Sequence, residues 1–225
     1  MAYPRFIHIY QTTSSAVLDA KVVAEEINKI LPGCDIDIRP PFKYEEKMIE
    51  HAKISDIKQP FERQTNHKKG SKMMTTTTIS LYDGFVIQKM LAEIIPTAEI
   101  SLAHIHIIFT SLFTGTFSED DWRYHARAVI CGTPSIISTT GIVEALAKPR
   151  EFYLAQLFGG LTEDNDMLKK KFAGRFISYD DEDKITAASV NYALQAIFFF
   201  ITSGEPFCNN KDCRLFNAHW QEDLI

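Results

Sequence analysis

The sequence predicts an α/β fold that forms one domain. Short apolar segments with strand-like patterns alternate with a helix that carries a clear apolar stripe. A long helix near the C-terminus is apolar almost all round, which is typical of a buried helix. The chain has 225 residues, 45% of them hydrophobic and 12% aromatic, which suffices to bury a full core. We therefore treat residues 1–225 as one domain with a surface excursion at about 42–80.

The N-terminal part predicts a β-α-β unit. Phe6–Tyr10 has the composition of a short buried strand, and residues 16–31 repeat apolar side chains at helical spacing. Pro32 and Gly33 end this helix, and residues 34–38 alternate as a second strand that stops at a pair of prolines. Such a unit favours two parallel strands in one sheet.

The remaining elements are predicted from the same two periodicities. We expect an irregular excursion at 42–80 with one or two helical turns at 45–52. A helix, a buried strand and a charged loop should follow at 82–95, 103–110 and 118–125. Two short strands are expected at 126–131 and 135–138, then a helix at 143–158 interrupted by Pro149 and a long helix at 180–204.

Composition limits the classes of function. The net charge of −5 argues against nucleic acid as a partner. The longest apolar run is too short to cross a bilayer, and the N-terminus lacks the pattern of a signal peptide. We therefore expect a cytoplasmic protein with no membrane partner. In that reducing compartment, the four cysteines favour thiols or metal ligands over disulfides.

The C-terminal segment contains the sharpest candidate site. Cys208, Cys213 and His219 follow one another at short spacing, and these side chains can converge on one zinc ion. A structural zinc site needs four ligands, so Cys131 or His125 would supply the fourth. In the alternative interpretation the two cysteines are small buried residues and His219 hydrogen-bonds locally.

Two further groups of histidines are weaker candidates. His104 and His106 are two residues apart on a predicted strand, so they face the same side and could bind a metal or line a cleft. The alternative is that they are polar residues on a half-buried strand. His125 lies near arginines that could bind an anion, or it pairs with Glu119, Asp120 or Asp121. The sequence contains no P-loop, dinucleotide fingerprint, nucleophile elbow or His-Glu-x-x-His signature.

In the order of these elements, the chain resembles the archaemetzincins, a family of metzincin-type zinc metallopeptidases. The resemblance rests on Phe109-Thr-Ser-Leu-Phe113, on Ile136-Ile-Ser138, and most specifically on Gly204-x3-Cys208-x4-Cys213-x-Leu215. The chain is similar to a mainly archaeal branch of that family that lacks His-Glu-x-x-His. The resemblance implies a zincin-like mixed sheet with packed helices, including a long buried C-terminal helix.

The departures from the family pattern bear on catalysis. The resemblance places zinc ligands and a general base where this chain has Ile197, Phe198 and Ile201, and Phe207 replaces a third histidine. None of these side chains can ligate zinc or accept a proton. The family's final Cys-x-x-Cys pair is also missing from this sequence, so we expect His219 to replace one of its ligands.

Three functions remain open. The first is a non-catalytic or atypical metallopeptidase-family protein with a structural zinc site at Cys208, Cys213, His219 and Cys131. The second is a metal-dependent hydrolase whose displaced site uses His104, His106, His125 and His219, with Glu144 and Glu205 as further candidates. The third is a metal-free protein that binds a peptide or protein partner through residues 42–80. The sequence leaves the oligomeric state open.

Overall fold

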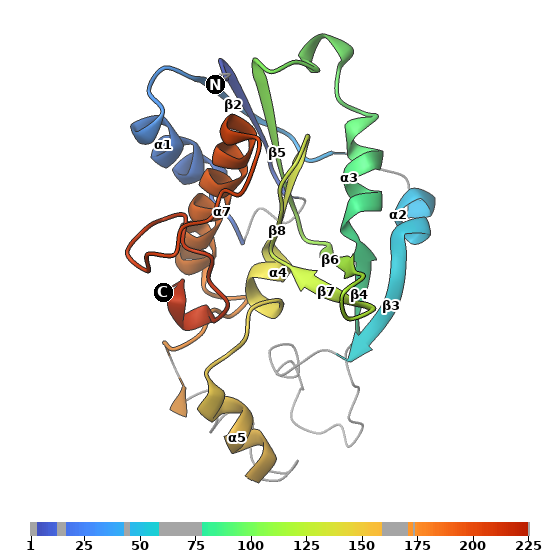
Figure 1. Ribbon diagram of the computed structural model, residues 1–225, viewed down its shortest axis with the longest axis vertical. Helices are drawn as coiled ribbons and strands as arrows, with labels where there is room; N and C mark the ends of the chain where they lie inside the picture. Colours follow the sequence, from blue (N-terminus) through green and yellow to red (C-terminus); the bar gives the residue numbers. More distant parts are fainter. Residues whose placement is uncertain are drawn as a thin grey trace.

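A computed structural model describes residues 4–12, 17–42, 46–58, 78–158, 171–172 and 174–224. Its main layer is a five-stranded sheet with the strand order β2-β1-β5-β9-β8 (Figure 1). The strands are β1 (Phe6–Tyr10), β2 (Asp35–Arg39), β5 (His104–Thr110), β8 (Val129–Ile130) and β9 (Ser135–Ser138). All neighbours in this sheet are parallel except β8 and β9. The structure is therefore a mixed α/β fold, as predicted.

The predicted β-α-β unit is confirmed, with a shorter helix. β1 and β2 pair in parallel and are joined by α1 (Ala20–Ile30). The side chain of Asp19 accepts hydrogen bonds from the backbone N–H groups of Lys21 and Val22, and so caps the helix. The predicted start at residue 16 was therefore too early, and residues 13–16 lie outside the described part of the chain.

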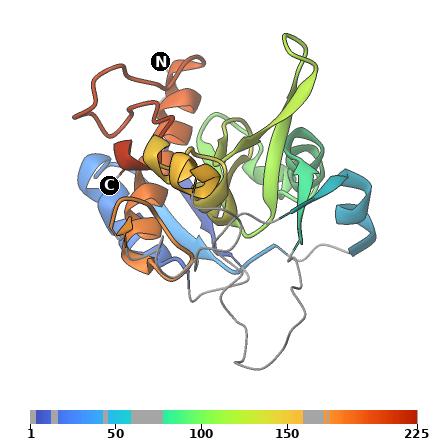
Figure 2. The same cartoon turned by 90° about the horizontal axis from the view of Figure 1, so that it is seen from below.

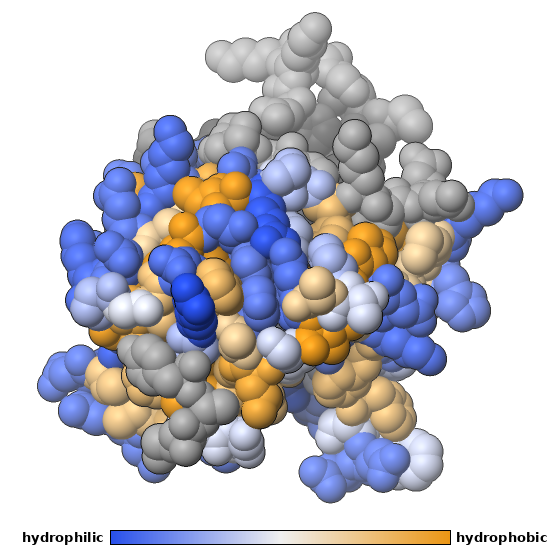
Figure 3. Space-filling view, turned by 90° about the horizontal axis from the view of Figure 1, so that it is seen from above, coloured by the Kyte–Doolittle hydropathy of each residue, from blue (hydrophilic) through white to orange (hydrophobic). Residues whose placement is uncertain are grey.

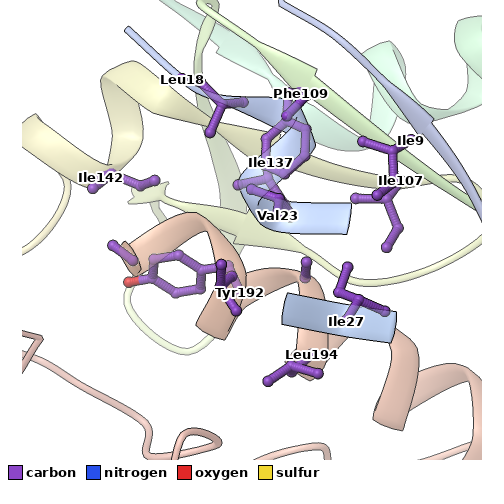
Figure 4. Packing of buried hydrophobic residues seen from close by; sticks show 14 of the residues in the cluster. Ile9, Leu18, Val23, Ile27, Ile107, Phe109, Ile137, Ile142, Tyr192 and Leu194 are labelled. Atoms are coloured by element: carbon purple, nitrogen blue, oxygen red, sulfur yellow. The ribbon is translucent and has the colours of Figure 1, made fainter. Parts of the chain in front are cut away.

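The hydrophobic core lies between the five-stranded sheet and two helices. α1 and the long helix α7 (Glu182–Thr202) cover one face of the sheet, and Figure 4 shows their side chains meeting those of the strands. Ile9, Ile107 and Ile137 of the sheet are fully buried in this layer. Burial of each large aliphatic side chain contributes about 1.5–3 kcal/mol, so this interface is a major source of stability.

The predicted long C-terminal helix is confirmed as α7. Glu182 and Asp183 occupy its first turn, where negative charge faces the unpaired N–H groups of the helix. α7 is long and apolar enough to span a membrane by length and composition, but most of its apolar stretch is buried inside the protein. It therefore has the environment of a core helix in a globular domain.

The opposite face of the sheet is divided into two halves. α3 (Gly84–Ala92) covers the half nearer the carboxyl ends of the parallel strands, where Ile87 and Leu91 pack on Tyr10 and Ile108. The other half faces the linker from α3 to β5, which includes a short 3-10 helix, η2 (Thr97–Glu99). This second half carries the polar side chains described below.

A second sheet corrects two predictions. Strands β3 (Lys53–Lys58), β4 (Thr78–Asp83), β6 (Phe113–Ser118) and β7 (Arg123–Arg127) form it in that order. Part of the predicted irregular excursion is therefore regular, because it contains β3 and the start of β4. The helical turns predicted at 45–52 are confirmed as α2 (Glu46–Ala52). Residues 43–45 and 59–77 lie outside the described part of the chain.

The predicted charged loop at 118–125 is a projecting β-hairpin formed by β6 and β7 (Figure 2). Edge-to-face aromatic contacts stabilise it, because the ring of Phe117 meets those of Trp122 and Tyr124 at centroid distances of 6.0 and 5.4 Å. The run of acidic residues at the turn concealed the strand pattern in the sequence.

Three other predicted elements have different bounds. The helix expected at 82–95 is α3, which begins later because Tyr82 pairs with β6 as part of β4. The helix expected at 143–158 is two helices, α4 (Thr139–Glu144) and α5 (Arg150–Phe158). The strand expected at 126–131 is divided between β7 and β8. A last 3-10 helix, η3 (Gln221–Asp223), lies at the end of the described chain.

The close packing of α4 on β7 gives a test of the fold. Alanine usually stabilises a helix relative to glycine, but a Cβ at Gly141 would overlap the carbonyl oxygen of Arg127 and lie 2.9 Å from the Cα of Ala128. We expect Gly141→Ala to lower the free energy of unfolding by about 1–3 kcal/mol, as measured by urea denaturation. Gly33→Ala is the control, because its Cβ would meet nothing within 4 Å. Equal stability of the two variants would contradict this packing.

Candidate metal centre

The candidate site follows from side-chain alternation in three adjacent parallel strands. Ile7 and Ile9 of β1 point into the core with α1 and α7, so His8 and Tyr10 point to the opposite face. The register sets Asp37 of β2 and His106 of β5 on either side of His8. Three polar side chains therefore lie in one row across the sheet.

His8 is held by contacts on both ring nitrogens. Its Nδ1 lies 2.6 Å from Oδ1 of Asp37, and its Nε2 lies 2.9 Å from Nδ1 of His104. Because a carboxylate only accepts, Nδ1–H of His8 donates to Asp37. In the neutral ring, Nε2 then carries the lone pair, which accepts from His104. This is the arrangement in which a carboxylate orients a metal-binding imidazole.

Glu99 reaches the same place from η2, in the linker that precedes β5. Both of its carboxylate oxygens accept hydrogen bonds from the guanidinium of Arg39, at 2.7 and 2.9 Å. These hydrogen bonds lower the pKa of Glu99. Oε2 of Glu99 lies 4.0 Å from Nε2 of His8 and 3.9 Å from Nε2 of His106. An ionised carboxylate therefore faces two imidazole nitrogens.

His106 is almost fully buried and has a defined hydrogen-bond chain. Its Nδ1 lies 3.2 Å from the hydroxyl of Tyr10, which accepts from Arg39 at 2.9 Å. Tyr10 therefore donates to Nδ1, and Nε2–H of His106 donates to the backbone carbonyl of Glu99 at 3.4 Å. Burial lowers the pKa of His106 to about 4, so the ring is neutral at physiological pH.

These side chains form a group that could hold a metal ion. One ring nitrogen each of His8 and His106 and a carboxylate oxygen of Glu99 lie within 4.8 Å of one another. Ligand atoms around tetrahedral zinc, with bonds of about 2.0–2.2 Å, are about 3.3–3.6 Å apart. The distances from Glu99 to the two imidazole nitrogens therefore need to shorten by about half an ångström. His106 must also change its tautomer, so that Nδ1 carries the proton and donates a hydrogen bond to the hydroxyl oxygen of Tyr10. The donor set fits zinc, since two imidazoles and one carboxylate are common zinc ligands.

The group is enclosed rather than open. His8 and His106 are 5% and 1% exposed, whereas the side chain of Glu99 is 21% exposed. Solvent therefore reaches the group from the side of Glu99. Ile100 and Leu102, which follow Glu99 in the chain, are exposed. Figure 3 shows separate hydrophobic patches among hydrophilic residues on the surface that it presents.

Of the four histidines predicted to form a displaced site, the structure brings two together. His104 and His106 lie on one face of β5 as predicted, and both contact His8, at ring-centroid distances of 5.2 and 4.7 Å. His125 is instead on the β6–β7 hairpin, where its Nε2 lies 2.9 Å from Asp121. His219 lies in the C-terminal segment and lines a cavity of about 210 Å³ with residues of α7.

The predicted C-terminal zinc ligands are not gathered in this structure. All four cysteines are free thiols. Within the described residues, no three ligand atoms of Cys131, Cys208, Cys213 and His219 lie within 4.8 Å of one another. Sγ of Cys208 and Sγ of Cys213 each accept from a backbone N–H two residues later, at 3.4 Å. Burial, with the charge of Glu205, raises the pKa of Cys131 to about 11. Zinc binding at this turn stays a prediction.

Glu144 and the three positions on α7 where the resemblance places zinc ligands and a base have structural roles in this fold. Glu144, a candidate for the displaced site, accepts a hydrogen bond from the hydroxyl of Tyr179 at 3.0 Å. On α7, where the resemblance places zinc ligands and a base, Ile197 is fully buried, and Phe198 and Ile201 are half-buried. This stretch of α7 is therefore part of the core.

Sequence reasoning missed His8, Asp37 and Glu99. A signal for the first two was present, because residues 6–10, 35–39 and 104–107 each alternate polar or aromatic with aliphatic side chains. Aligning the polar positions of the predicted parallel strands would have placed His8 and Asp37 beside His106. Glu99 lies in a linker, and its contribution depends on a tertiary contact that no local pattern reveals.

The lowered pKa of His106 predicts a pH-dependent stability in metal-free protein. The unfolded chain binds the proton near pH 6.5 and the folded chain near pH 4, so the free energy of unfolding should fall as pH decreases through this window, by about 3 kcal/mol at most. Urea denaturation in EDTA would measure it. His106→Gln should flatten the profile, whereas His51→Gln, at an exposed position, should not. An unchanged profile for His106→Gln would contradict this assignment.

Comparison with known proteins adds the family. Residues 3–225 match the family described as "Probable metallopeptidase family (DUF6775)". No curated protein and no solved structure matched the chain. The family description agrees with a chain whose structure gathers two histidines and a glutamate. Because the match covers nearly the whole sequence, the chain belongs to this probable metallopeptidase family.

Proposed function

We propose that the chain is an atypical metallopeptidase-family protein that binds one zinc ion through His8, His106 and Glu99. The observation that carries the proposal is the 2.6 Å contact between Nδ1 of His8 and Asp37. It fixes the tautomer that leaves Nε2 free of a proton, and that nitrogen faces the other two ligands. His104 forms a hydrogen bond with this Nε2 atom, so it is the side chain that zinc would displace.

We also propose that the fold is zincin-like and related to the archaemetzincins. The support is a mostly parallel five-stranded sheet with an antiparallel edge strand, β8, packed on a long C-terminal helix, α7. The Gly204–Cys213 pattern follows that helix at the spacing of the family resemblance.

Four free thiols favour a cytoplasmic location for the protein, because reduced cysteines persist in that compartment.

The zinc content of selected variants distinguishes a site at His8, His106 and Glu99 from a site at the C-terminal cysteines. We expect about one zinc per chain by elemental analysis, lost in His8→Asn and in His106→Gln because each removes a ligand. Asp37→Asn should weaken binding by about 10–100-fold, since it removes the partner that orients His8. The double variant Cys208→Ser/Cys213→Ser should keep its zinc.

The control is His51→Gln, which changes an exposed imidazole on α2 and should leave the zinc content unchanged. Circular dichroism of each variant separates ligand loss from unfolding. Zinc that persists in both folded histidine variants and disappears with the two cysteines would move the site to the C-terminal turn and overturn the proposal.

Hydrolysis at the same ion is the second candidate function. The donor set favours it, because two histidines and one glutamate also form catalytic zinc sites. Zinc supplies Lewis acidity toward a carbonyl group when it is bound. Against it, both histidines are nearly inaccessible, and α7 has apolar side chains where the resemblance places the ligands and base. We therefore place hydrolysis second to zinc binding.

A peptide-cleavage assay decides between the two functions. We expect the zinc-loaded protein to leave a mixed peptide library intact, as followed by mass spectrometry. Cleavage that EDTA abolishes, and that is absent in His106→Gln but retained in His51→Gln, would establish the hydrolase instead.

A further inference from the structure

We infer that Arg39 is an internal cation that competes with the metal ion for Glu99 and lowers the metal affinity of the centre. This inference rests on the proposed zinc site. It concerns how tightly that site holds its ion, which neither the family nor the ligand set determines.

The position of Arg39 carries the inference. Its side chain is 22% exposed and donates to both oxygens of Glu99, at 2.7 and 2.9 Å. It also donates to Oδ2 of Asp37 at 2.9 Å and to the hydroxyl of Tyr10 at 2.9 Å. Thus one guanidinium contacts a proposed ligand and the two groups that hydrogen-bond to the other proposed ligands, His8 and His106.

The charge balance shows why this cation opposes the ion. Without metal, the carboxylates of Asp37 and Glu99 face the single positive charge of Arg39, which leaves a net charge of about −1 from these three ionised groups. A divalent ion would bring the total to about +1. Because Oε2 of Glu99 lies 2.7 Å from Nη1 of Arg39, an ion bound to that oxygen lies close to a like charge in a poorly hydrated place.

Arg39 also has an effect in the opposite direction, since it orients Glu99 and Asp37. Loss of such an outer contact typically weakens metal binding by about 10–100-fold. The two effects separate by substitution. Arg39→Lys keeps the charge and loses the paired contact with both oxygens of Glu99, whereas Arg39→Gln keeps an amide donor and loses the charge. If repulsion dominates, only the neutral variant binds zinc more tightly.

The test is isothermal titration of EDTA-treated, dialysed full-length protein with zinc chloride. We expect Arg39→Gln to bind zinc about tenfold or more tightly than the unmodified chain. Arg39→Lys should bind no more tightly than the unmodified chain. The double variant Arg39→Gln/His8→Asn should lose the gain, which assigns the tighter binding to this centre. Thermal denaturation without zinc confirms that each variant is folded.

The outcomes distinguish this inference from the function on which it rests. If the unmodified chain binds zinc and folded Arg39→Gln binds it equally well or more weakly, the role of Arg39 is overturned and the metal centre stands. An absence of zinc binding in every folded chain overturns the metal centre, and the inference with it. Tighter binding in both Arg39→Gln and Arg39→Lys would assign the effect to the shape of the side chain, and would also overturn the inference.

Discussion

The parallel register of β2, β1 and β5 is the constraint on which the candidate site depends. Side chains on a strand alternate between faces, so a shift of one residue would exchange aliphatic for polar positions. Burial of Ile7, Ile9 and Ile107 against α1 and α7 prevents that shift. The same register then sets His8 between Asp37 and His106 on the other face. Core packing on one face thus determines the geometry of the proposed metal ligands on the other.

The polar face is stable because almost every group on it has a partner. Burial of a polar group without a hydrogen bond costs about 1–3 kcal/mol, and both buried imidazoles have contacts on each ring nitrogen. Arg39 and Glu99 supply the charges that complete the network. The network is therefore a stable structure without metal, and a metal ion must replace contacts as well as form them. The affinity for zinc is therefore the property that decides whether the proposed centre is occupied.

The sequence predicted those elements that a strong local period defines. The β-α-β unit, β5 and α7 each have a clear apolar pattern, and their core positions follow from it. It did not predict β3 or the β6–β7 hairpin, because both contain many polar side chains. β3 is defined by its pairing with β4, and β6 and β7 are defined by their pairing with each other. In the site, His104 and His106 were identifiable because they share a strand. Glu99 was not, because only the tertiary fold brings η2 to the sheet.

The contacts of His8 join parts of the chain that are distant in sequence. It touches Asp37, 29 residues away, and His104, 96 residues away. Contacts of such long range carry a large loop-closure cost and slow the folding of a domain. The α1–β1–β2 unit can assemble from neighbouring segments, whereas the histidine row is complete only after β5 has joined the sheet. During synthesis, β5 emerges well after β1, so the centre cannot exist until nearly half of the chain has been made.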